Sequence, residues 1–262
     1  MIQPSRTVPA DEAAPEAPMT YAMNRFLPFA FCAAFAPAGL GAAEAASLQA
    51  SPVLIELRQN SPSATVQIRN TGQAPIAVQT RVYRWTQQNG EESLEETDDL
   101  AASPPLTTLQ PGTTYSVRLV QVNRSPVTQE QAFRVLVDEL PDPNRQQSGT
   151  IAIVVRHSIP VFLLAEETRP AQVNWAIGTR NGRLVLRATN TGDRRVRLSN
   201  VSVKLAGGQN VSFGSGLLGY ALAGSTMEWM SPGRFNGAAG AGATISATTD
   251  RGAITGQAAG LR

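Results

Sequence analysis

Residues 149–162 read GTIAIVVRHSIPVF, two apolar runs separated by Arg156, His157 and Ser158. Ile151, Ile153 and Val155 would lie on one face of an extended chain, because successive side chains of a strand point to opposite sides. The alanine and the valine between them would lie on the other face. A strand that is apolar on both faces is usually buried on both sides. The pattern therefore predicts either a central core strand or a strand kept for pairing with a partner.

Shorter alternating runs precede this stretch. They carry apolar residues at every second position and read PVLIEL, SATVQIRN, IAVQTRVYRW, YSVRLVQVN and AFRVLVDEL. Turn-forming residues separate them, among them Asn70-Thr71-Gly72, Asn89-Gly90 and Pro111-Gly112, and no run shows sustained helical periodicity. Short strands at this spacing predict a β-sandwich over residues 47–164.

The polar segment AEETRP, residues 165–170, predicts a linker. Beyond it the strand candidates are shorter and richer in glycine, which predicts a second, smaller β-sandwich over residues 171–262. Its last residues, GQAAGLR, are predicted to be frayed. Asn-Thr-Gly occurs in both halves, at 70–72 and at 190–192, and indicates that the two sandwiches use similar turn chemistry.

The first 46 residues are predicted to precede the folded part of the chain. Residues 23–49 contain Arg25, then an apolar stretch, then small residues, which is typical of a secretory signal peptide. Either Met23 is therefore the expected start of translation, or residues 1–22 are an unstructured extension ahead of the signal. The only cysteine, Cys32, lies in this segment, so the exported chain would have no disulfide and would depend on its core for stability.

The composition and the motifs argue against catalysis, cofactors and nucleic acid. Hydrophobic residues make up 42% of the chain and charged residues 16%, as in globular proteins, and a net charge of +2 is too small to indicate nucleic-acid binding. The chain has one histidine, His157, and it lacks a nucleophile elbow, a phosphate-binding loop and a His–Cys cluster at metal-binding spacing. The acidic run EESLEETDD, residues 91–99, fits no calcium loop and is predicted to be a solvated loop between strands. We therefore expect no enzyme activity, no metal and no cofactor.

Three segments taken together resemble the periplasmic pilus-assembly chaperones of the PapD-like family. They are DLAASPPLTTLQPGTTYSVRLV (99–120), FRVLVDELP (133–141) and the opening stretch. The likeness is greatest to the branch that serves spore-coat-U-like and archaic pili. The resemblance implies a non-enzymatic periplasmic protein with an all-β fold, in which two immunoglobulin-like β-sandwich domains are arranged in an L shape.

The resemblance also implies a mechanism. A pilin subunit of this kind is a sandwich that lacks its last strand, and the chaperone lends it the final strand of domain one. The donor side chains in this sequence would be Ile151, Ile153 and Val155. The implied partners are pilin-like or coat-protein-U-like subunits and an outer-membrane usher. Exposed alternating isoleucines would also allow the free chaperone to associate with itself.

Family members hold their two domains together through a network of ion pairs. On this sequence the network maps onto Arg118, Glu139 and Asp250, all of which keep the charge that it needs. One arginine and two carboxylates suit a partly buried position that sets geometry.

The better-known members anchor the carboxylate at the C-terminus of the subunit with two basic residues. The matching positions here are Pro52 and Pro160, and neither side chain can supply a positive charge. Arg156 is the candidate replacement, because it lies four residues before Pro160 and shares its parity along the strand. An exposed arginine at the end of a strand is the alternative interpretation.

A second hypothesis on function is a structural or adhesive surface protein built from two immunoglobulin-like domains. A folded module of that class would normally bury or blunt an apolar edge strand. The strand that is apolar on both faces therefore favours the chaperone.

Overall fold

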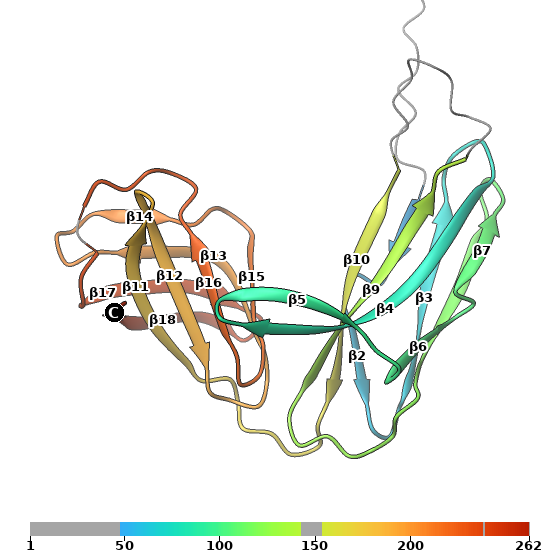
Figure 1. Ribbon diagram of the computed structural model, residues 1–262, viewed down its shortest axis with the longest axis horizontal. Helices are drawn as coiled ribbons and strands as arrows, with labels where there is room; N and C mark the ends of the chain where they lie inside the picture. The colour runs from blue at the N-terminus through green and yellow to red at the C-terminus, as the bar shows by residue number, and fades with distance from the viewer. Residues whose placement is uncertain (1–47, 143–153, 238, 262) are drawn as a thin grey trace, which may run out of the picture. The chain divides into compact units, whose positions relative to one another are not determined.

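The computed structural model describes residues 48–142, 154–237 and 239–261, and every regular element among them is a β-strand. The strands form two domains that follow each other along the chain (Figure 1). No helix among the described residues is long and apolar enough to cross a membrane. The prediction of an all-β, two-domain fold is confirmed. The predicted leader, residues 1–46, lies outside the described residues.

The first domain packs two sheets against each other. One sheet has the strand order β1-β3-β8-β6, and the other has the order β2-β10-β9-β4-β5 with β7 also paired to β4. In chain order the strands are β1 (Leu48–Ser51), β2 (Ile55–Arg58), β3 (Ser63–Asn70), β4 (Ile76–Gln88), β5 (Glu91–Glu96), β6 (Leu100–Ser103), β7 (Leu106–Leu109), β8 (Thr114–Gln121), β9 (Gln131–Leu140) and β10 (Arg156–Leu164). Alternate side chains of both sheets fill the space between them, as Ile68, Leu119 and Val137 do, and each of these is fully buried.

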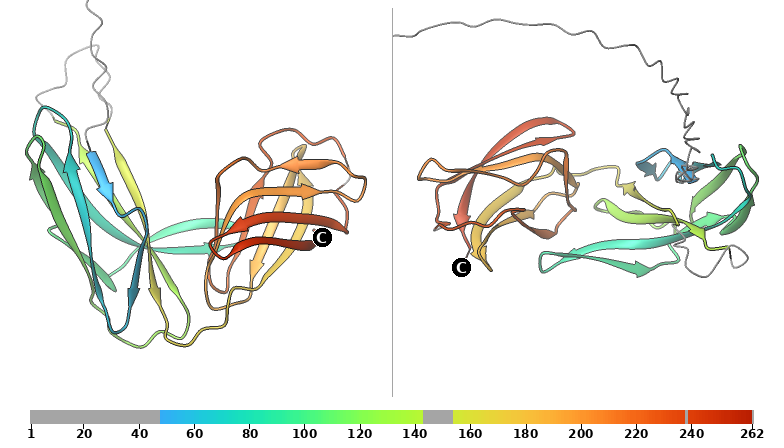
Figure 2. Two further views of the ribbon diagram at one scale, coloured as in Figure 1. Left: turned by 180° about the vertical axis from the view of Figure 1, so that it is seen from behind. Right: turned by 90° about the horizontal axis from the view of Figure 1, so that it is seen from above.

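The second domain is a single curled sheet, coloured from yellow-orange to red in Figure 2. Its strand order is β14-β13-β17-β18-β11-β12-β16, and β15 also pairs with β13. The strands are β11 (Val173–Arg180), β12 (Arg183–Asn190), β13 (Val196–Lys204), β14 (Asn210–Ser212), β15 (Leu217–Ala221), β16 (Thr226–Met230), β17 (Ala243–Thr249) and β18 (Gly252–Gly260). Its core includes Ile177, Leu186 and Ile245. The predicted linker, residues 165–170, lies between β10 and β11.

The two faces of β10 belong to different apolar clusters. Ile159, Val161 and Leu163 point into the core of the first domain. Phe162 and Leu164, on the opposite face, pack in a separate cluster that includes side chains of the second domain. Burial on both faces explains why this strand is apolar throughout its second half.

The two Asn-Thr-Gly motifs have the same structural role. The buried side chain of Asn70 accepts a hydrogen bond from the Gly72 amide and donates to the carbonyl of Leu109, 39 residues away. Asn190 likewise accepts from the Gly192 amide and donates to backbone carbonyls before β16. Each asparagine therefore closes its own turn and joins it to a distant strand, and the expectation of similar turn chemistry is confirmed.

Two sequence-based expectations about local structure are wrong. The acidic run at 91–99 is not only a loop, because Glu91–Glu96 form β5, which pairs along β4 with all six side chains exposed. The C-terminal segment is also not frayed as predicted. It forms most of β18, which pairs with β17 and runs to Gly260. The glycine at position 256 allows this strand to pass a large side chain closely.

That side chain is Trp175, which lies over β18 at Gly256. A Cβ atom added at Gly256 would lie 2.5 Å from Trp175 Cδ1. We expect Gly256→Ala to lower the free energy of unfolding by about 1–3 kcal/mol, because the indole would have to leave its packed position. Equilibrium unfolding in urea measures the change. Gly207→Ala is the control, since a Cβ there meets nothing within 4 Å, and equal effects of both variants would contradict the explanation.

Candidate functional site

The first half of β10 has an unpaired edge. β10 pairs with β9 from Arg156 to Leu163, but it pairs with β2 only from Val161 to Leu164. Residues 156–160 therefore have a strand on one side, and no described strand pairs with them on the other. The backbone N–H and C=O groups of such an edge can accept a further strand.

The predicted donor residues lead into this edge. Val155 is half-buried against the core of the first domain, and its carbonyl accepts a hydrogen bond from the Glu139 amide at 2.9 Å. Val154, its neighbour, is 45% exposed. The other two predicted donor residues, Ile151 and Ile153, lie outside the described residues.

His157 joins the open edge to the neighbouring sheet. Its ring Nε2 lies 2.8 Å from the carbonyl oxygen of Leu48 in β1, within hydrogen-bond distance. The ring is half-buried. This contact links β10 to β1 of the other sheet, so the only histidine of the chain has a structural partner.

Arg156 takes part in a cluster of three charges on neighbouring strands. Its guanidinium pairs with Asp138 of β9, and Asp138 also accepts a hydrogen bond from Arg81 of β4 at 2.6 Å. Burial acts to raise the pKa of Asp138, but the hydrogen bonds from the two arginines outweigh it, so this pKa lies below its ordinary value. Two arginines share one carboxylate, and the side chain of Arg156 remains 61% exposed.

The three residues predicted to form interdomain ion pairs lie on separate elements. Arg118 is exposed on β8 and donates to the Ser63 hydroxyl at 3.5 Å. Glu139 lies on β9, and Asp250 is exposed between β17 and β18. The ion pairs of the described residues do not join Arg118, Glu139 and Asp250 to one another.

A different arginine joins the domains. Arg195, just before β13, donates from its guanidinium to Glu130 at 2.6 Å and to Glu56 of β2 at 2.5 Å. Its backbone amide also donates to Glu130, at 3.0 Å. The side chains of Arg195 and Glu130 are 8% and 2% exposed. Burial raises the pKa of Glu130 above its ordinary value, although Arg195 opposes the shift.

Three aromatic rings pack beside this ion pair. Trp85 of β4 and Phe162 of β10 face Tyr220 of β15, with ring centroids 5.5–6.0 Å apart. The guanidinium of Arg195 lies 3.6 Å from the centre of the Phe162 ring, and Arg134 lies 3.7 Å from that of Trp85. Aromatic contacts and cation–π contacts therefore both stabilise the junction.

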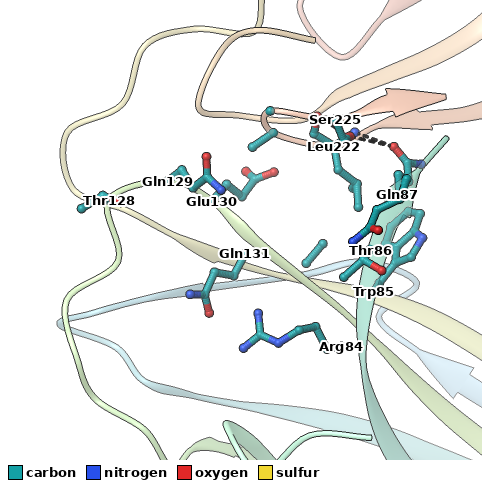
Figure 3. A pocket seen from close by; sticks show the side chains of 14 residues that line it. Arg84, Trp85, Thr86, Gln87, Thr128, Gln129, Glu130, Gln131, Leu222 and Ser225 are labelled. Atoms are coloured by element: carbon teal, nitrogen blue, oxygen red, sulfur yellow. Dashed lines mark hydrogen bonds between the residues drawn. The ribbon is translucent and has the colours of Figure 1, made fainter. Parts of the chain in front are cut away.

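Gln87 completes the junction as a buried polar clamp. Its amide nitrogen donates to the Tyr220 carbonyl at 2.8 Å, and its oxygen accepts from the Leu222 amide at 2.9 Å and the Ser225 hydroxyl at 3.1 Å. Gln87 is one of the residues that line a cavity of about 460 Å³ with largely polar walls. Figure 3 shows its side chain pointing toward Leu222 and Ser225. Among the described residues no group of three or more His, Cys, Asp or Glu side chains could hold a metal ion.

Sequence reasoning missed these junction residues. The sequence did indicate that the strand has contacts on both sides. The run from Ile159 to Leu164 is apolar on both faces, which predicts that both faces are buried. No local pattern singles out Gln87 in β4 or Arg195 in the turn before β13, since polar residues at such positions are usually exposed. Their burial depends on contacts with the other domain.

The chain is similar to known pilus chaperones. A family model described as pili and flagellar-assembly chaperone, PapD N-terminal domain, matches residues 47–173. No curated protein matches the sequence.

Solved structures show the same two-domain fold. The chaperone in the CsuC–CsuE chaperone-tip adhesion subunit complex from archaic Csu pili of Acinetobacter baumannii is 21% identical with a TM-score of 0.63, covering 83% of this chain and 100% of that chain. The E. coli chaperone DraB is 19% identical with a TM-score of 0.54, covering 82% and 97%. The match to the Salmonella enterica SafA pilin–SafB chaperone complex is 17% identical with a TM-score of 0.55, covering 81% and 96%.

Proposed function

The chain belongs to the PapD-like family of periplasmic pilus chaperones, and we propose that it stabilises pilin-like subunits by donating a β-strand to them. The observation that carries the proposal is the unpaired edge of β10 at residues 156–160. An edge strand adds to an incomplete sheet through main-chain hydrogen bonds, while alternate side chains fill the groove of the partner. The solved complexes of CsuC with CsuE and of SafB with SafA support pairing with a subunit.

The donor segment would extend β10 toward the N-terminus. Ile151, Ile153 and Val155 would enter the subunit, and burying each side chain would contribute about 1.5–3 kcal/mol. Val155 has the parity of Ile159 and Val161, which face the core of the first domain. The apolar side chains of the donor segment would then be buried in the groove of the subunit, on the same face of the strand that is buried in the chaperone's own core further along β10.

The charge cluster on β10 is the proposed anchor for the carboxylate at the C-terminus of the subunit. Pro52 and Pro160 offer no positive charge, whereas Arg81 and Arg156 share Asp138, so this cluster of three side chains has a net charge of +1. Asp138 would hold the Arg156 guanidinium in place, and its exposed side would bind the carboxylate.

Location and further partners follow from the same proposal. The signal-like segment 23–49 would direct the chain to the periplasm. The chaperone would deliver pilin-like or coat-protein-U-like subunits to an outer-membrane usher, and its open edge would allow self-association while no subunit is bound.

Co-expression with a subunit tests strand donation. Wild type, Ile153→Asp and Val154→Asp are each produced in a periplasm with pilin-like subunits from the same source. We expect wild type and Val154→Asp to keep a subunit soluble and to co-purify with it, and Ile153→Asp to lose at least nine-tenths of the bound subunit, roughly the effect of one lost apolar anchor.

Val154→Asp is the matched control, because it places the same charge one residue away on the opposite face. Circular dichroism verifies that both variants fold. Equal rescue by all three proteins would overturn strand donation. Failure of wild type to rescue any subunit would overturn the chaperone proposal and favour the structural or adhesive protein.

A further inference from the structure

We propose that Pro160 and β2 form a stop that sets the register of the subunit strand on β10, and that Val53 contacts the end of that strand. The proposal rests on strand donation and adds to it the position at which pairing must end. A strand without such a limit could slide by two residues and keep the same side-chain parity.

The direction of the backbone groups identifies the available donors. The Glu139 amide donates to the Val155 carbonyl, and β10 runs antiparallel to β9 with Arg156 opposite Asp138. In an antiparallel pair the groups of successive residues point alternately toward and away from the partner strand. The backbone groups of Arg156 and Ser158 therefore point to the open edge.

By the same alternation the backbone of Pro160 faces the open edge, but proline has no N–H to donate there. From Val161 onward β2 occupies the edge in parallel register, with Ile55 opposite Val161. The Ser158 amide is thus the last donor that an added strand can reach. A longer strand would have to displace residue pairs between β2 and β10, beginning with Ile55 and Val161.

Val53 lies where the added strand would end. It precedes Ile55, the first paired residue of β2, by two positions, and it is 79% exposed. It is more exposed than any other large apolar side chain among the described residues. An apolar residue at the end of the subunit strand would cover it, whereas a shifted strand would leave it in water.

Disulfide mapping tests the stop. The only cysteine of the chain, Cys32, is replaced by serine, and Ser158→Cys, which is exposed, is paired with single cysteines placed along the subunit strand. We expect cross-linking at one dominant subunit position. In Pro160→Ala, which restores an N–H at the edge, we expect a second cross-linked position two residues further along the strand.

Binding measurements test the role of Val53. Val53→Asp should weaken the complex about tenfold, since one apolar contact is lost. Leu106→Asp is the control, because Leu106 is 59% exposed on β7 in a different part of the same sheet, and this variant should bind as wild type does.

The outcomes separate this inference from the function on which it rests. If no subunit binds the wild-type chain, strand donation itself fails. If the complex forms but the wild type cross-links at several positions, the stop is overturned while strand donation stands. Equal binding by Val53→Asp and Leu106→Asp would overturn the contact at Val53.

Discussion

Replacing Phe162 by alanine should lower the free energy of unfolding by about 3–5 kcal/mol, as expected for a large aromatic side chain removed from a packed interior. The Phe162 side chain is fully buried, 6.0 Å from the Trp85 ring and 5.7 Å from the Tyr220 ring. The cavity would open between the two domains, where neither domain can close it by itself. The cation–π contact with Arg195 would be lost as well.

Equilibrium unfolding in urea, followed by tryptophan fluorescence and circular dichroism, measures this effect. Leu94→Ala is the control, because Leu94 is 44% exposed on β5 and its removal should change the free energy of unfolding by less than about 0.5 kcal/mol. If Phe162→Ala cost no more than this control, the aromatic cluster would not be a packed part of the fold in solution.

The sequence predicts the strands and turns well because their causes are local. Period-two alternation follows from the geometry of a strand, and Asn70 and Asn190 close their turns through bonds to residues two positions away. The tail was mispredicted for an equally physical reason. Glycine and alanine have low strand propensity, but Gly256 is required by the nearby Trp175, which lies 81 positions earlier in the sequence.

The candidate site likewise has one part that the sequence indicated and one part that it did not. The sequence indicated that β10 has two apolar faces, but it did not show the open edge, which exists because β2 pairs with β10 only from Val161 onward. The junction was not indicated either, since Arg195 and Glu130 are 65 residues apart and no local pattern selects them from the other charged residues. The family resemblance pointed instead to Arg118, Glu139 and Asp250, which the ion pairs of the described residues do not join to one another. Only the folded structure shows which charged side chains are buried and desolvated.

Replacing Arg195 by alanine should also cost about 3–5 kcal/mol at pH 7, because it leaves the Glu130 carboxylate buried without a counter-charge. Glu130 is 2% exposed, and its guanidinium partner is Arg195. Arg183→Ala is the control. Arg183 is exposed at the start of β12, so its replacement should change the free energy of unfolding very little. Unfolding in urea at fixed pH measures both variants.

The cost of Arg195→Ala should depend on pH in a defined direction. The folded protein raises the pKa of Glu130 above that of the unfolded chain, so the fold binds this proton more tightly. The contribution of Glu130 is then most favourable below the unfolded pKa and is lost as the pH rises through the folded pKa. Without Arg195 the folded pKa should rise further, so the variant should be less impaired at pH 5 than at pH 7.

Glu130→Gln in the Arg195→Ala background separates charge from packing. A neutral amide needs no counter-charge, and its oxygen can still accept the hydrogen bond from the backbone amide of residue 195. The double variant should therefore regain most of the stability lost at pH 7 and should lose the pH dependence. A double variant as unstable as Arg195→Ala would instead show that the arginine acts through its packing on Phe162, and the buried charge would not be the cause.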